Sequence, residues 1–119
     1  MSIPYSDNIK VLDAVVASTT SDAYDVSKRQ QILVQFIAAA ISSGNGVFTI
    51  DGSNDGVNWV TGIAFQDAKA TASNTWVVSK TISSNISEGA YVKAGWRFIR
   101  VVLARTTDGN YTAILQNGG

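Results

Sequence analysis

The chain of 119 residues contains no cysteine and no histidine, and these two absences exclude much of common enzyme chemistry. Without histidine, neither a Ser-His-Asp nor a Cys-His nucleophile can be assembled. Without thiolates and imidazoles, only oxygen ligands are left for a metal ion, and disulfides are impossible. We therefore expect that the protein is not an enzyme and that it needs no cofactor.

Charge and long apolar runs are scarce as well. Nine basic and nine acidic side chains give a formal net charge of zero, whereas binding to phosphate backbones requires clustered Lys and Arg. The longest apolar block, residues 36–41, is too short to span a bilayer, and the first ten residues do not resemble a signal peptide. We expect that the protein has no nucleic-acid partner and does not insert into a membrane. We also expect that it is synthesised in the cytoplasm.

Short runs of β-branched and aromatic residues alternate with clusters of Gly, Asn, Asp and Ser through most of the chain. This spacing is typical of an all-β fold. It predicts an antiparallel β-sandwich, jelly-roll-like, of about eight strands, as a single domain over residues 9–119 behind a flexible N-terminal arm, residues 1–8. The clearest strands are expected at 9–17, 23–26, 47–51, 57–65, 75–82, 96–105 and 111–116.

Two segments are ambiguous. Residues 30–41 fit a helical stripe through Ile32, Phe36 and Ile37, and they also fit a strand with Ile32, Val34, Phe36, Ala38 and Ala40 on one face. We favour the strand, because an all-β context needs partner strands, but the helix remains an alternative. A short helical turn is also possible over residues 87–93, where Gly89 and Gly95 limit its length.

The most informative segment is residues 48–59, in which a turn of Gly52, Ser53, Asn54, Asp55 and Gly56 separates two alternating runs. We interpret it as a β-hairpin with Trp59 as the core anchor, and Asp108-Gly109 as the turn of a second hairpin. Calcium at the Asp51 to Asp55 turn is the alternative, since the spacing loosely matches the start of an EF-hand loop. Position twelve of such a loop falls on Gly62 rather than on a bidentate Glu.

A second set of residues could form an interface or a ligand platform: Trp76, Tyr91, Trp96, Arg97 and Arg105. Exposed aromatic rings can stack on sugar rings, and Trp76 is the best candidate for exposure because it follows a small polar stretch. Arg97 and Arg105 share one face of an expected strand, where they could pair with carboxylates of the same chain or of a partner subunit.

The Ser-Asn-Asp-Gly-x-x-Trp segment ending at Trp59, together with Trp96-Arg97-Phe98-Ile99-Arg100-Val101, resembles a pattern of small β-sandwich virion proteins of tailed bacteriophages. The same two elements also resemble discoidin-like sandwich domains. The phage resemblance implies a non-enzymatic structural protein of the virion, of the decoration, cement, spike or tail-associated type. It further implies a homo-oligomer that contacts other virion proteins, made in the host cytoplasm.

The alternative function is a carbohydrate-binding or adhesion module on the same kind of sandwich. In that interpretation the aromatic residues that lie in loops would form the platform, and the ligand would be a glycan of the host surface.

Overall fold

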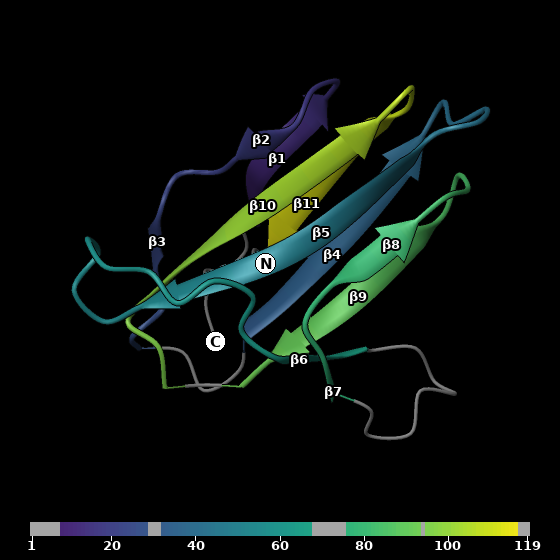
Figure 1. Cartoon of the computed structure of the whole chain (residues 1–119). Coiled ribbons are helices and arrows are strands. Elements are labelled where there is room, and N and C mark those ends of the chain that lie inside the picture. Colours follow the sequence, from purple (N-terminus) through teal and green to yellow (C-terminus); the bar gives the residue numbers. More distant parts are fainter. Residues whose placement is uncertain (1–7, 29–31, 68–75, 94, 117–119) are drawn as a thin grey trace, which may run out of the picture.

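The computed structural model describes residues 8–28, 32–67, 76–93 and 95–116, and within these ranges it is all-β. Two antiparallel sheets pack face to face (Figure 1), so the expected sandwich is confirmed, with eleven strands rather than about eight. Among these residues there is no helix long and apolar enough to cross a membrane. Residues 1–7, most of the expected arm, lie outside the described ranges.

The six-stranded sheet has the order β1-β11-β4-β9-β6-β7, and the five-stranded sheet has the order β2-β10-β5-β8, with β3 also paired to β10. The strands are β1 (Ile9–Val15), β2 (Thr19–Thr20), β3 (Tyr24–Asp25), β4 (Ile32–Ala39), β5 (Asn45–Ser53), β6 (Phe65–Asp67), β7 (Trp76–Val77), β8 (Lys80–Ile82), β9 (Ser87–Val92), β10 (Phe98–Thr106) and β11 (Asn110–Leu115).

Most connections carry the chain from one sheet to the other. From β3 onward, consecutive strands lie in opposite sheets except for β6 and β7, which pair with each other. The longest ladders therefore join strands that are distant in sequence, such as β5 with β10 and β4 with β9. Figure 1 shows the β4–β5, β8–β9 and β10–β11 connections side by side at one end of the sandwich.

A stack of aromatic rings fills the space between the sheets. Phe36 of β4 and Phe48 of β5 stack with centroids 4.2 Å apart, which joins the two sheets at their centre. Phe65 meets Phe36 edge-on, and Tyr111 meets Phe48 in the same way. All four rings are fully buried. The apolar residues at alternate positions of β4, β5 and β11 thus point between the sheets and form the core.

Asp108 joins the β10–β11 connection to the β4–β5 connection. Its carboxylate accepts backbone N–H groups from Ser42, Ser43 and Gly44, at 2.9 to 3.2 Å. Burial opposes ionisation of this carboxyl, but the N–H groups and the charge of Arg105 outweigh it and lower the pKa of Asp108. Asp108-Gly109 is thus a turn, as predicted, but it leads from β10 in one sheet to β11 in the other and does not form a hairpin within a sheet.

The structure resolves both ambiguous segments as strands. Residues 32–39 form β4, with Ile32, Val34, Phe36 and Ala38 buried on one face as predicted. Ala40, predicted on the same face, lies after the end of the strand and is exposed. The possible helical turn over residues 87–93 is not formed, because Ser87–Val92 is strand β9, paired to β4 over six residues. Its inward side chains include the buried carboxylate of Glu88, which lies 3.7 Å from the ammonium group of Lys80 on the opposite sheet.

Two other predicted strands differ from the structure. The run 57–65 is mostly loop: one bridge joins Gly52 to Val60, and the chain then crosses so that Phe65 can enter the core in β6. The run 75–82 is divided between β7 and β8, which belong to different sheets. The prediction of Trp59 as a core anchor is therefore wrong, since its ring is half-buried outside the core with the guanidinium group of Arg100 above it, 4.3 Å from the ring centroid.

Gly46 of β5 lies where the two sheets approach each other closely, against the ring of Tyr111. A Cβ atom there would lie 2.5 Å from the ring of Tyr111, so we expect Gly46→Ala to lower the free energy of unfolding by about 1–3 kcal/mol through overpacking. The same change should cost less in the Tyr111→Leu background, because the smaller side chain leaves room. Urea unfolding of the parent, the two single variants and the double variant measures the coupling free energy between residues 46 and 111. If the two changes in unfolding free energy simply add, the two residues are not in contact.

Candidate functional site

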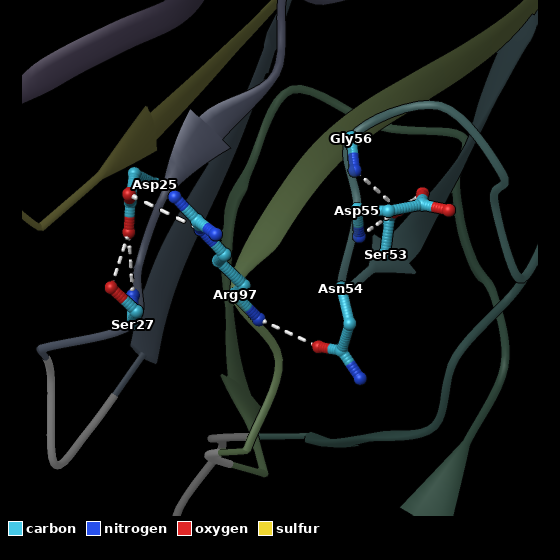
Figure 2. Close-up of polar contacts among 7 residues, drawn as sticks. All are labelled: Asp25, Ser27, Ser53, Asn54, Asp55, Gly56 and Arg97. Atoms are coloured by element: carbon cyan, nitrogen blue, oxygen red, sulfur yellow. Dashed lines mark hydrogen bonds and ion pairs between the residues drawn. The ribbon is translucent and has the colours of Figure 1, made fainter.

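The turn after β5 is organised by the hydroxyl of Ser53 (Figure 2). This oxygen accepts the backbone N–H groups of Asp55 and Gly56 and lies 2.6 Å from the carbonyl oxygen of Asn58. The carboxylate of Asp55 accepts the N–H groups of Val57 and Asn58 and the side-chain amide of Asn58. The predicted turn residues therefore do form a turn, one that is closed by its own side chains.

These hydrogen bonds also determine the charge of the turn. The backbone N–H groups of Asn58 and Val57 contribute most, followed by the Asn58 amide and the Ser53 hydroxyl, and together they hold the pKa of Asp55 well below its usual range. The other carboxylate of the suggested calcium loop, Asp51, accepts the Nε–H of Arg100 at 2.9 Å and the N–H of Gly62 at 3.1 Å. Both carboxylates thus already have protein donors, and the described residues contain no group of three or more His, Cys, Asp or Glu side chains that could hold a metal ion.

The two arginines of the predicted platform lie far apart along β10. Arg97 precedes the strand; its guanidinium group lies 3.9 Å from the carboxylate of Asp25, and its backbone N–H donates to Asn54 (Figure 2). Arg105 lies near the other end of the strand and donates to the carbonyl oxygen of Gly109 at 2.8 Å. Each arginine therefore has a local structural role, and the structure does not bring the two together.

The three aromatic residues of the platform do come together. Trp76 of β7 lies beside Tyr91 of β9, with ring centroids 6.4 Å apart, and it is 46% exposed. Trp76 and Trp96 line a common cavity of about 490 Å³, with Val60, Ile63, Ala64 and Lys93 as the other lining residues among those described. Trp96 covers the inward side of Gly52, where a Cβ atom would lie 2.6 Å from its indole ring. This aromatic cavity is the strongest candidate for a ligand site.

A second surface was not anticipated from the sequence: the outer face of the six-stranded sheet over its three neighbouring strands β4, β9 and β11. The outward residues of its strands β4, β9 and β11 include no charged side chain; they are Leu33, Gln35, Ile37, Ala39, Ser87, Gly89, Tyr91, Asn110, Thr112 and Ile114. A groove of about 360 Å³ runs over Gly89, bordered by Leu33, Gln35 and Ile114. We call this surface the uncharged face.

The sequence does contain a signal for the uncharged face. In the run 32–39 the positions between the core residues are also apolar or neutral, where a solvent-facing strand would carry charges. The same holds for the run 110–115. What the sequence does not show is that β4, β9 and β11 are neighbours, and only their adjacency turns three neutral strand faces into one surface.

The pH dependence of stability tests the turn. The pKa of Asp55 is lower in the folded than in the unfolded chain. The ionised Asp55 carboxylate therefore stabilises the fold fully above the unfolded-state pKa, and this stabilisation is lost as the pH falls through the folded-state pKa. We expect Asp55→Asn to be less stable than the parent at pH 7 and the difference to narrow toward pH 2. Urea unfolding from pH 7 to pH 2 measures this.

Asp22→Asn is the matched control, since it removes an exposed carboxylate that accepts no hydrogen bond from the described residues. A difference that is the same at every pH would contradict the assignment.

Comparisons with known proteins give one likeness. No protein-family model matches the chain, and no curated protein matches it. Among solved structures, the crystal structure of the SPBc2 prophage-derived protein YomS is similar, with a TM-score of 0.67 and 12% sequence identity over 92% of this chain and 90% of that one. At this identity the likeness shows a shared fold, which extends over nearly the whole of both chains.

Proposed function

We propose that this protein is a non-enzymatic structural component of a bacteriophage particle that assembles with copies of itself and with other virion proteins. The observation that carries the proposal is the uncharged face. Protein surfaces exposed to water ordinarily carry many charged side chains, and interface centres are depleted of them. Three adjacent strands without one outward charge therefore suit burial against a partner.

The fold likeness supports the phage assignment. The similar solved structure is that of a prophage-derived protein, and the match covers both chains almost completely. The resemblance of residues 48–59 and 96–101 to small virion proteins of tailed bacteriophages rests on the amino-acid sequence and does not depend on the fold. A decoration, cement, spike or tail-associated role is the finer form of the proposal, with the virion as its location.

The proposal includes the absence of catalysis. Asp51, Asp55 and Asp108 each accept hydrogen bonds that hold a loop or a strand end, and Asp25 accepts the hydroxyl and N–H of Ser27. These carboxylates support the structure where they are. With no histidine or cysteine in the chain, a proton-transfer or nucleophilic centre would have to be built from other groups.

Ile37→Lys tests the uncharged face. Ile37 points outward from β4 at the centre of the face, so the variant should fold normally but place an unpaired charge in an interface. We expect self-association to weaken by at least about 30-fold in sedimentation, because a buried unpaired charge costs several kcal/mol. Thr49→Lys, on the outer side of β5 in the other sheet, is the matched control and should leave assembly unchanged.

A second measurement addresses the particle itself. Mass spectrometry of purified virions should detect the protein, and particles made with Ile37→Lys in place of the parent should contain less of it than particles made with Thr49→Lys. A chain that is monomeric at high concentration and absent from purified particles would overturn the proposal.

A further inference from the structure

The aromatic cavity differs from the uncharged face in shape and in chemistry. It is concave, its volume of about 490 Å³ falls in the range of small-molecule sites, and its described lining residues include two indole rings and one cation. The loop residues Val60, Ile63 and Ala64 form its apolar wall. A site of this kind can accept a ligand that has a flat apolar face and a polar edge.

The two indoles provide the surfaces for a flat ring. Trp96 is backed by the strand, because its ring packs on Gly52 in the longest strand pairing of the five-stranded sheet. Trp76 lies on the edge strand β7, with Tyr91 at its side and nearly half of its surface exposed. The C–H face of a pyranose packs on such rings while its hydroxyl groups remain in water, so little desolvation is required.

Lys93 determines the charge of the ligand. It is the one charged residue among the described lining residues, none of which is acidic. It forms no ion pair with any residue in the described ranges, whereas Lys10, Lys80, Arg97 and Arg100 each lie within 4.0 Å of a carboxylate. A cation that has no ion-pair partner among the described residues, in a cavity that two indole rings also line, favours an anionic ligand.

We propose that the aromatic cavity binds an acidic sugar, a pyranose that carries a carboxylate, within a larger glycan. The sugar ring packs against Trp76 and Trp96, and the carboxylate pairs with Lys93. This activity goes beyond assembly, and it would give a particle component a contact with an anionic surface polysaccharide. Uronate and sialic-acid residues share the required chemistry.

An array that displays uronate-containing, sialylated and neutral glycans is the first test. We expect retention of acidic glycans and not of their neutral counterparts, and the uronate and sialyl positions identify the source of the carboxylate. If uronates are retained, the affinities for tetragalacturonate and for its methyl ester are measured by titration with tryptophan fluorescence. The difference between them gives the effect of the carboxylate charge. Sialyllactose and lactose serve in the same way for sialylated glycans.

Two variants with matched controls test the residues. Trp76→Ala should weaken binding of the acidic glycan by about 10-fold or more, from loss of the stacking surface. Lys93→Gln should weaken it by about 5-fold and remove the preference over the neutral counterpart, as expected for an exposed ion pair. Trp59→Ala and Lys28→Gln replace the same residue types outside the cavity and should bind as the parent does.

The proposal is overturned if no acidic glycan is retained at millimolar concentration, if the neutral counterpart binds equally well, or if Lys93→Gln and Trp76→Ala bind like their controls. The result is independent of the assembly proposal. Ile37→Lys is expected to bind the sugar even as a monomer, and failure to bind sugar would not affect incorporation into particles.

Discussion

The fold depends on the repeated passage of the chain between two sheets. Because β6 and β7 are the one consecutive pair of described strands that hydrogen-bond to each other, most strands receive their hydrogen bonds from segments that are distant in sequence. The stacked rings of Phe36 and Phe48 join the sheets at their centre, and Asp108 fastens neighbouring connections at one end. Such a topology is cooperative and forms slowly, since distant segments must meet before any ladder is complete.

The polar side chains serve mainly to hold loops and strand ends. Ser53 and Asp55 close the turn after β5, Asp51 fixes Arg100 above Trp59, and Asp108 caps the connection between β4 and β5. The outward positions of β4, β9 and β11 carry no charged side chain, and this neutrality underlies the proposed assembly.

The two proposed surfaces adjoin each other at Tyr91. This residue points outward on β9, within the uncharged face, and its ring lies beside Trp76 at the border of the aromatic cavity. A partner seated over the centre of the face, at Ile37 and Gln35, would leave the cavity at the rim of the contact. Assembly at the uncharged face and sugar binding in the aromatic cavity would then use different parts of the same molecule.

Much of the fold was predictable residue by residue. Alternation identified the buried faces of β4 and β5, including Phe36, Phe48 and Ile50, and turn chemistry located the bends at 52–56 and 108–109. The exposure of Trp76 was also expected from the polar stretch before it. These features depend on neighbours in sequence, which a single chain displays directly.

Strand pairing was decided by tertiary structure alone. A turn between two alternating runs has the same residue types whether the second run folds back onto the first or crosses to the opposite sheet, because period-two alternation requires only that one face be buried. The second predicted hairpin is therefore a crossing, the run after Gly56 leaves its neighbour after one bridge, and Ser87–Val92 is extended because β4 pairs with it. The amino-acid sequence determined an all-β chain without histidine or cysteine chemistry. Only the packing of distant strands placed Trp76 beside Tyr91 and merged three neutral strand faces into one surface.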